Sequence, residues 1–567
     1  DQGDDIYATI AGIGLSNDVG GNLMSPDSEG QQRAMLAAYQ QAGWSPADID
    51  LIECHGTGTP IGDAVEFNSL QALWQDHEPG HRRCVIGSVK SNVGHLLTAA
   101  GSAGLIKLLL AMKHRQLPPT ANFERAASRL ALNESPFEVL TEVREWVRRD
   151  ADSPRRAAIS AFGFGGINAH VLLQEWRGHA TQPGVQEKQA TPAIAVVGME
   201  AQFGPWRCLD QFRLRVFGFD ADQQPSQPTN CWGVDRKNAG EGFFINEVTV
   251  PLGRYRIPPA ELREMLPQQL LMLQVATAAL EDAGIGQADP VSRNSTGVYI
   301  GIGLDLNTTN FHFRWSLLNR ARDWNDQLGL NLSEADLERW TGELRTAAGP
   351  PLNANRTMGA LGGIVASRIA RAFHLGGPSF TVSGEEASGL RALEAGVRAL
   401  QRGEIETAVV GAVDLAGEVR ATLAQIEDRP LSNDMPIGEG ATALVLKRHQ
   451  DAIRDGDRIY ALVEGLGAAT EGGVEHLLPS QDAYQISFQR ACDNASVMPD
   501  SIGLVERHGS GIAAEEAMET QALNELLASS KPALTCAHAS IKSSIGHCGA
   551  AGGLASVARA SLSLYHQ

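Results

Sequence analysis

The chain of 567 residues lacks the usual marks of a secreted, membrane-spanning or metal-binding protein. Its 7 cysteines are scattered and form no Cys-x-x-Cys pair, which argues against a disulfide framework and for a reducing cytosol. No residues have metal-ligand spacing, and no signal peptide opens the chain. The most apolar segment, residues 96–112, contains Thr98, Ser102 and Lys107, so it predicts a buried core helix rather than a membrane span. We expect a cytoplasmic protein with no bound metal or cofactor.

Positive charge is also scarce. The chain has 47 Lys and Arg against 66 Asp and Glu, a net charge of −19, and no basic cluster with interleaved aromatic residues. This balance argues against nucleic acid or an anionic membrane as the main partner. The composition is otherwise globular, with 43% hydrophobic and 20% charged residues. Because single cores stop growing near ~250–300 residues, the length predicts more than one domain.

Parts of the chain occur twice. Four blocks recur 452 or 453 positions later: Gly3–Ala8 as Gly456–Ala461, His55–Gly58 as His508–Gly511, Glu66 as Glu519, and Lys90–His95 as Lys542–His547. A nearly constant offset across separated blocks indicates tandem homologous domains, and a period far above ~50 residues excludes a solenoid.

The two copies are incomplete in opposite ways, since the first has no counterpart of residues 191–455 and the second ends before any counterpart of the first copy's last part. We predict the C-terminal half of one domain at residues 1–176. A short polar linker follows at 177–190. Residues 191–567 form a second domain that lacks its C-terminal end. We expect the chain to be a window of a longer polypeptide.

The second copy alternates apolar strands with helices. Runs typical of strands buried on both faces lie at 193–198, 297–302, 408–413 and 442–446. Helical spacing lies at 262–282 and 389–402, and the polar segment 307–353 is typical of a helical excursion from the core. This pattern predicts an α/β fold with largely parallel sheets.

The first chemical motif is a histidine followed by a glycine–threonine loop. Gly56 and Gly58 allow close approach of a ligand and positive φ, and Thr57 and Thr59 offer hydroxyls to an elongated polar substrate. His55, at a strand end, could donate a hydrogen bond to a developing oxyanion. A structural turn with a satisfied histidine is the alternative, and the motif alone does not separate the two.

The second motif places Lys90 and His95 where a helix rich in small residues begins. The helix dipole there disfavours a protonated imidazole, so a neutral His95 could act as a donor while Lys90 orients or polarises it. A helix-start histidine beside a surface lysine is the alternative. The recurrence of both motifs at one offset favours the functional interpretation.

A third motif is the turn Gly163-Phe-Gly-Gly166. A glycine-dense turn can aim backbone amides at one point, as an oxyanion hole requires, although tight packing is the usual explanation. It is not a dinucleotide fingerprint, because no Gly-x-Gly-x-x-Gly opens a helix. Cys54 and Cys548 stand beside histidines, but Cys54 should face the core, since neighbouring strand residues point to opposite faces. Cys548 fails as a nucleophile on similar grounds.

These blocks resemble the β-ketoacyl synthases of the thiolase superfamily. The segments that carry the resemblance are Glu53-Cys-His-Gly-Thr-Gly-Thr59, Gly87-Ser-Val-Lys-Ser-Asn-Val-Gly-His95 and Phe162-Gly-Phe-Gly-Gly-Ile-Asn-Ala-His170. The resemblance implies a layered α-β-α-β-α fold, here in tandem partial copies. It also implies an acyltransferase with a Cys-His-His site, which condenses acyl thioesters with malonyl units carried on the phosphopantetheine of an acyl carrier protein.

The resemblance also implies residue roles. His55 and His95 would stabilise the enolate, and Lys90 would support His95. Thr57 and Thr59 would line the phosphopantetheine channel. The three residues expected by the oxyanion hole are Gly163, Phe164 and Gly165. The nucleophilic cysteine would lie upstream of Asp1, so we expect this chain alone to condense nothing.

The second copy departs from the family pattern at the position of the nucleophile. Residues 377–390 look like the nucleophile segment, but Glu386 occupies the cysteine position. Although His508, Lys542 and His547 remain, the loss of the cysteine makes the copy resemble a chain-length factor, the silent partner of an active ketosynthase. A fused pair of this kind is similar to polyunsaturated-fatty-acid and polyketide synthases. It implies an internal pseudo-dimer, with or without further homodimerisation.

Two other hypotheses stay open. The pair could be a non-catalytic scaffold that binds carrier proteins, although the intact loop from His55 to Thr59 counts against this. Alternatively, Glu386 could promote decarboxylation of malonyl-carrier protein at the second site.

Overall fold

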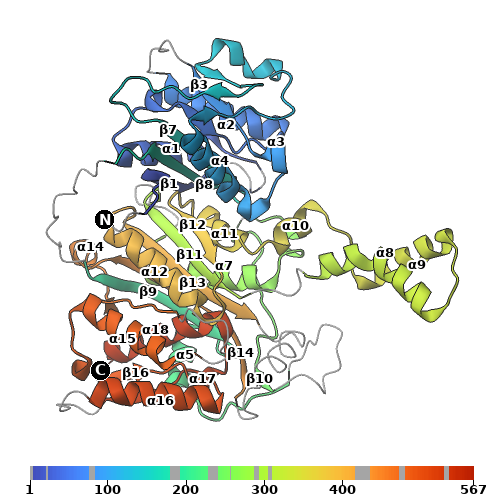
Figure 1. Ribbon diagram of the computed structural model, residues 1–567. Coiled ribbons are helices and arrows are strands. Elements are labelled where there is room, and N and C mark those ends of the chain that lie inside the picture. The colour runs from blue at the N-terminus through green and yellow to red at the C-terminus, as the bar shows by residue number, and fades with distance from the viewer. Residues whose placement is uncertain are drawn as a thin grey trace. The chain divides into compact units, whose positions relative to one another are not determined.

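The computed structural model (Figure 1) describes residues 4–20, 23, 25–75, 83–178, 192–227, 241–255, 257–286, 293–303, 309–415, 435–470, 479–528 and 536–566. Two compact units result. Unit 1 comprises residues 1–191, 293–297 and 373–379, and unit 2 comprises 192–292, 298–372 and 380–567. Most of the expected linker, from residue 179 on, lies outside the described residues. The division at residues 176 and 191 therefore stays a prediction.

Unit 1 is built on a six-stranded sheet in the order β1-β8-β7-β2-β3-β5. Its strands are β1 (Ala8–Asn17), β2 (Leu51–Glu53), β3 (Cys84–Gly87), β5 (Phe137–Glu138), β7 (Arg156–Gly163) and β8 (Ile167–Glu175). Strands β7, β2, β3 and β5 run parallel, whereas β8 pairs antiparallel with both β7 and β1. Every strand of this sheet except β8 points in one direction, so the sheet of unit 1 is largely parallel, as expected, with β8 as the exception. The reason is the tight β7–β8 hairpin, since a short turn can join only antiparallel strands.

Helices cover both faces of this sheet. Helices α1 (Ser28–Ala42) and α2 (Pro60–Trp74) share one apolar cluster with the sheet, and α4 (Ala100–His114) contributes to a second cluster. Local sequence sets their ends. Asp27 caps the start of α1 and Gly43, with φ of 66°, ends it. Thr59 caps α2, which has Pro60 in its first turn.

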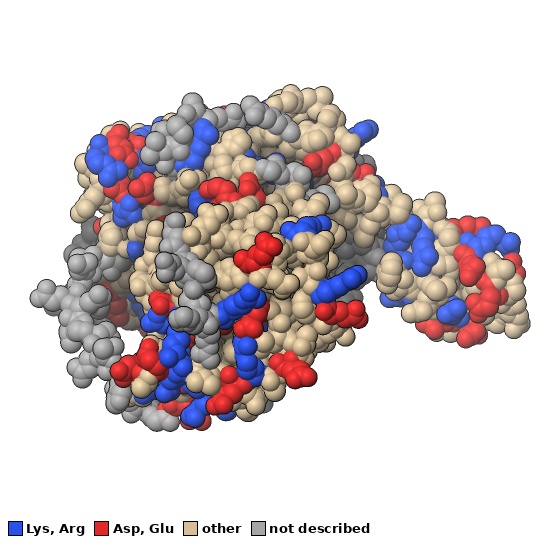
Figure 2. Space-filling model, turned by 90° about the horizontal axis from the view of Figure 1, so that it is seen from above, with Lys and Arg blue, Asp and Glu red and all other residues tan. Residues whose placement is uncertain are grey.

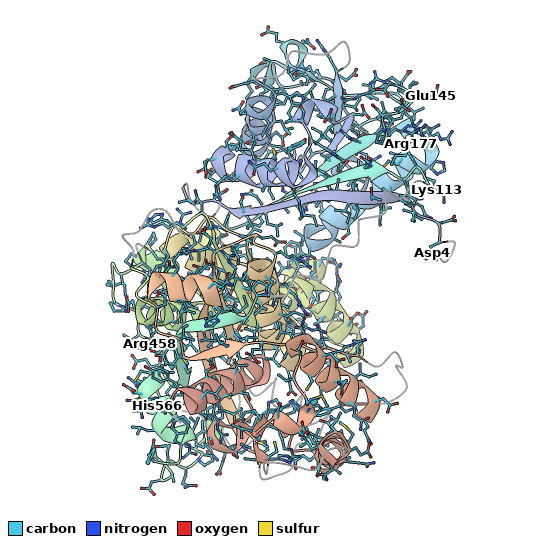
Figure 3. All side chains as sticks on the ribbon, turned by 90° about the vertical axis from the view of Figure 1, so that its left-hand side faces the viewer. Asp4, Lys113, Glu145, Arg177, Arg458 and His566 are labelled. Atoms are coloured by element: carbon cyan, nitrogen blue, oxygen red, sulfur yellow. The ribbon has the colours of Figure 1, made fainter. Side chains whose placement is uncertain are left out.

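The apolar helix predicted at residues 96–112 is buried on one face only. Helix α4 buries Leu108 and Met112 in unit 1, but Ile106 and Leu110 are exposed. Lys113, near the end of α4, lies on the same side of unit 1 as Asp4, just before β1 (Figure 3), and its Nζ is 3.3 Å from the hydroxyl of Tyr7. No described helix combines the length and the apolar composition that a membrane crossing requires.

Unit 2 is built on a seven-stranded sheet in the order β12-β11-β13-β14-β9-β15, with β10 beside β14. Its strands are β9 (Ile194–Phe203), β10 (Gly242–Phe243), β11 (Thr296–Ile302), β12 (Ser379–Val382), β13 (Thr407–Leu415), β14 (Ile437–Arg448) and β15 (Ala461–Val463). The four predicted strands are present. However, β13, β14, β9 and β15 are successive antiparallel neighbours, so the expectation of a largely parallel sheet is wrong for unit 2.

Three long helices pack on this sheet. Helix α7 (Pro267–Asp282) begins later than the expected residue 262, after the separate short helix α6 (Pro259–Leu262). Helices α12 (Ser388–Gln401) and α18 (Gly549–His566) share one core cluster with β9, β13 and β14. The expected excursion is a helical hairpin, α8 (Thr309–Leu328) and α9 (Glu334–Ala348), which projects from unit 2 (Figure 1).

The elements around the candidate sites recur in both units. In unit 1, β2, α2, β3, the short helix α3 (Lys90–Val93) and α4 follow one another. In unit 2 the same order is β16 (Leu504–Glu506), α16 (Ala513–Ala528), β17 (Ala537–Ala539), α17 (Lys542–Ile545) and α18. Strands β2 and β3 pair in parallel, as do β16 and β17. Two copies of one local structure can therefore be compared within a single chain.

Candidate active sites

The loop after β2 is held by a buried carboxylate. Glu66 of α2 accepts the backbone amides of His55 and Gly56 at 2.7 and 2.8 Å. Gly56 and Gly58 have φ of 41° and 75°, so both adopt the expected left-handed conformations. Burial raises the pKa of Glu66 to about 7, against the amide hydrogen bonds, which lower it. Sequence reasoning gave Glu66 no role, although its recurrence as Glu519 was a visible signal.

His55 is oriented as a neutral hydrogen-bond donor. Its Nδ1 accepts the backbone amide of Phe162 at 3.3 Å, which leaves the ring proton of the neutral tautomer on Nε2. Burial, and then the charges of Lys90 and His95, lower the pKa of His55 to about 4. The imidazole is therefore neutral at physiological pH, as an oxyanion-stabilising donor requires.

His95 faces His55 but is not placed as expected. Their rings meet edge to face, with centroids 5.7 Å apart. Helix α4 begins only at Ala100, so His95 lies between two short helices and the helix-dipole argument made for it is wrong. Instead, Nδ1 of His95 accepts the amide of Leu97 at 3.0 Å, which again leaves Nε2 as the donor of the neutral ring.

Lys90, in the first turn of α3, is half-buried. Burial lowers its pKa, while the carboxylates of Glu66 and Glu53 act in the opposite direction. Among the described contacts, no hydrogen bond joins Lys90 to His95. Its charge acts on His55 instead, so the expected support of His95 stays a prediction.

The threonines and the glycine turn are only partly free to meet a ligand. Thr57 and Thr59 are joined through their hydroxyls at 3.1 Å, and the Thr59 hydroxyl also accepts the amide of Gly62 as the cap of α2. Gly165 and Gly166 have φ of 91° and 83°. The amide of Gly165 donates to the carbonyl of Leu23 at 3.0 Å.

Close packing accounts for part of the glycine turn. A side chain on Gly166 would meet Cβ of Asp18 at 2.6 Å, so a larger residue does not fit there. Gly163 ends β7, and Phe164 projects into solvent with 59% of its surface exposed. The role of Gly163, Phe164 and Gly165 beside an oxyanion hole stays a prediction.

The second site has the same construction. Glu519 of α16 accepts the amides of His508 and Gly509 at 2.7 and 3.1 Å, as Glu66 does in the first copy. Nδ1 of His547 accepts the amide of Gly549 at 3.4 Å. The ring of His547 is therefore oriented as that of His95 is, and the loop of His508 is held as that of His55 is.

The second site differs because a carboxylate fills it. Glu386, just before α12, places Oε2 3.1 Å from Nζ of Lys542 and 3.2 Å from Nε2 of His508, and Oε1 3.1 Å from Nε2 of His547. Burial alone would raise the pKa of Glu386. The hydrogen bond and charge of His547, then the charges of Lys542 and His508, hold it well below its usual range. Glu386 is thus a carboxylate bound by every retained site residue of its own copy.

The cysteines beside the histidines lie in surroundings that disfavour a reactive thiolate. Burial raises the pKa of both Cys54 and Cys548 far above the usual range of a thiol, which keeps them protonated and unreactive. The described cysteines are all free, and Cys231 lies outside the described residues. Within the described part of the chain, no group of histidine, cysteine and carboxylate side chains could hold a metal.

Comparison with known proteins agrees with this construction. The model of the β-ketoacyl synthase C-terminal domain matches residues 7–124 and again residues 460–567, and that of the N-terminal domain matches residues 192–452. The chain is similar, at 30% identity over its whole length, to a polyunsaturated fatty acid synthase polypeptide of Thraustochytrium sp. (strain ATCC 26185 / S-3), of which it spans 28%. A shorter match, 41% identity over 31% of the chain, is to polyketide synthase GfsA of Streptomyces halstedii, of which it spans 2%.

Solved structures show the same relationship. The structure described as PfaC keto synthase-chain length factor aligns with a TM-score of 0.83 and 29% identity, over 99% of this chain and 59% of that one. The ketosynthase from module 6 of the bacillaene synthase of Bacillus subtilis 168 aligns with a TM-score of 0.54 and 27% identity, over 66% of this chain and 61% of that one. The fold is therefore the thiolase-like ketosynthase fold, and the chain belongs to the β-ketoacyl synthase family.

Proposed function

We propose that the chain is part of a multidomain fatty-acid or polyketide synthase and joins the C-terminal half of an active ketosynthase to a silent chain-length factor. One observation carries this proposal: the chain builds the same two-histidine site twice and fills only the second with its own carboxylate. Among the described residues of the first copy, no contact engages Nε2 of His55 or His95, so both donors could meet a substrate.

The first site has the donors that a decarboxylative condensation needs. Loss of carbon dioxide from a malonyl thioester leaves the electron pair of the broken C–C bond as an enolate. The enolate oxygen would accept hydrogen bonds from Nε2 of His55 and His95, the atoms that their backbone contacts leave free. The enolate carbon would then attack an acyl thioester held on a cysteine, whose thiolate leaves as the new C–C bond forms.

The cysteine would come from a half-domain equivalent to residues 192–452, and the surface of unit 1 supports this. Four apolar residues around α3 and α4 are between 43% and 57% exposed: Val93, Leu96, Ile106 and Leu110. Their counterparts in the second copy are at most 1% exposed: Ile545, Cys548, Ala558 and Leu562. The latter are covered by α12, β13 and β14. A matching N-terminal half would cover the first set in the same way and bring the nucleophile.

The second copy would take no acyl group. Glu386 occupies the nucleophile position and is held as a carboxylate by Lys542, His508 and His547. Because Glu386 contacts all three of these side chains, both acyl transfer at this site and a decarboxylase role for Glu386 are disfavoured. We infer that this copy shapes the acyl tunnel of an internal pair.

The proposed partners follow from the reaction. The acyl and malonyl groups would arrive on the phosphopantetheine arm of an acyl carrier protein, with the Thr57 and Thr59 hydroxyls beside its path. On the face seen in Figure 2, Lys and Arg are interspersed with Asp and Glu rather than gathered into a basic field, so we propose no nucleic-acid partner. The free cysteines suit a reducing cytoplasm.

The test is to incubate the full-length protein with a radiolabelled acyl thioester and map the labelled peptide. We expect label on a cysteine outside residues 1–567 and none on the peptide that contains Glu386. No covalent label anywhere would favour a carrier-protein scaffold. Label on the Glu386 peptide would show that the second copy has been misassigned.

A further inference from the structure

A buried ion pair lies directly behind the first site. Glu53, the last residue of β2, is 2% exposed, and its Oε2 is 2.7 Å from Nζ of Lys107 on α4. The other oxygen, Oε1, accepts the backbone amide of Val89 at 2.5 Å. One carboxylate thus holds three elements together: the strand that leads into His55, the segment that leads into Lys90, and helix α4.

The position of Glu53 in the chain links this ion pair to His55 and Lys90. Glu53 precedes His55 by a single intervening residue, and Val89 directly precedes Lys90. The hydrogen bond between Glu53 and Val89 therefore ties together the backbones that carry the two site residues. A buried carboxylate without a partner would take up a proton and weaken as an acceptor, and Lys107 supplies the partner.

The surrounding packing is built for this contact. Gly104 lies one helical turn before Lys107, and a Cβ there would come within 2.8 Å of Cγ of Glu53. The absence of a side chain lets α4 lie close to β2, so that Lys107 reaches Glu53 across the sheet face. Glu53 and Lys107 are only 3% and 12% exposed as side chains, so solvent screens the pair little.

The second copy repeats the pair with a different cation. Glu506 ends β16 as Glu53 ends β2, and Nε of Arg559 on α18 lies 3.1 Å from its Oε1. The site of that copy is closed by Glu386, so the same ion pair stands behind one open and one filled site. The chain itself therefore supplies both a conservative substitution and a matched control.

We propose that the Glu53–Lys107 ion pair is a positioning element of the condensation site, which fixes the separation of His55 and Lys90 without touching substrate. This inference rests on the proposed function for the rate measurements described next, but not for the spectroscopic one. A displacement of ~1 Å in a reacting group can cost ~10²-fold in rate, so a small relaxation of this pair is enough to matter.

The experiment compares K107M, K107R and R559M in the full-length protein, with malonyl-carrier protein as substrate. We expect K107M to lower kcat by about ten- to a hundred-fold with little change in KM, because Lys107 contacts no substrate. K107R, which copies the arrangement of the second unit, should restore most of the loss. R559M removes the equivalent pair behind the filled site and should leave kcat nearly unchanged while lowering Tm by as much as K107M does.

Two results would overturn the proposal: a folded K107M with unchanged kcat, or an R559M that loses as much kcat as K107M. If K107M does not fold, E53D replaces it, because it keeps the charge but shortens the reach to Val89 and should lower kcat in the same way. A fully active E53D would then refute the idea.

A spectroscopic measurement tests this inference independently of the proposed function. In the wild type, burial and then the charge of Lys90 lower the pKa of His55 to about 4. If Lys90 moves away in K107M, a ¹³C NMR titration should show the pKa of His55 rising toward the ordinary histidine value, whether or not the protein condenses anything. An unchanged His55 titration in K107M would contradict the positioning role.

Discussion

The largest difference between the two copies of the histidine site is the carboxylate of Glu386, which fills the second site and has no counterpart among the described contacts of the first. Both hold the histidine loop with a buried glutamate, Glu66 or Glu519. In the second copy the carboxylate of Glu386 lies 3.2 Å from Nε2 of His508 and 3.1 Å from Nε2 of His547. The comparison teaches that a site can keep its two histidines and its lysine and still be filled, because the chain itself supplies an anion that they bind.

The largest expected effect tests whether the open copy alone is active. His55→Ala should lower the condensation rate of the full-length protein by about 10²–10³-fold, because it removes one donor to the enolate oxygen. His508→Ala, the same change in the filled copy, should lower the rate less than about threefold. The measurement is kcat for condensation. Equal losses in both variants would mean that the copies do not divide the work as proposed.

The next effect is on stability and concerns the filled copy. Glu386→Ala leaves Lys542 and His547 buried without their anion, which should destabilise unit 2 by about 2 kcal/mol, at the low end for a broken buried pair because Glu386 is about one third exposed. Differential scanning fluorimetry would report this as a lower Tm. The control is Glu385→Ala, since the neighbouring Glu385 is exposed. A Tm unchanged by Glu386→Ala would show that the network adds no stability.

The same network predicts a pH dependence that the open copy does not share. The folded pKa of Glu386 is depressed, so its stabilisation is present above the unfolded value of about 4.3. It is lost as the pH falls through the folded value. The gap in Tm between the wild type and Glu386→Gln should therefore be constant at neutral pH and shrink below about pH 4.3. A gap that stays constant down to pH 3 would show that the charge of Glu386 is not what stabilises unit 2.

The smallest expected effect is on stability and concerns a difference between the two loops that follow His55 and His508. Thr59 caps α2 through its hydroxyl, whereas the second copy has Ile512 at that position. Thr59→Ala should destabilise unit 1 by about 1 kcal/mol through the lost cap, and Thr59→Ser should restore it. Chemical denaturation followed by circular dichroism would measure both. If Thr59→Ser behaves like Thr59→Ala, the hydroxyl is not acting as a cap.

Sequence patterns predicted the recurring parts of the fold well, because repeated motifs record repeated local structure. The strands before His55 and at residues 194–203, 296–302, 407–415 and 437–448 follow from apolar runs. The direction of pairing in the sheet of unit 2 did not follow, because a continuous apolar run is equally compatible with parallel and antiparallel neighbours once both faces are covered.

The sequence predicted the histidines of the site but not the groups that orient their rings. Three separated motifs pointed to His55, Lys90 and His95, yet the atoms that set the tautomers are backbone amides of Phe162 and Leu97. Any residue except proline supplies such an amide, so no sequence pattern marks it. The ion pair of Glu53 with Lys107 escaped for a related reason, since its partners are 54 positions apart and meet only when α4 packs on β2.

The exposed apolar face of α4 also bears on how this protein can be handled in the laboratory. In a recombinant protein truncated to unit 1, the side chains of Ile106 and Leu110 would be exposed to water. Contiguous apolar surface of that kind drives self-association and retention by chaperones. Expression of residues 1–176 alone should therefore give inclusion bodies or soluble aggregates. Co-expression with a matching N-terminal half-domain should cover this face and give a discrete species.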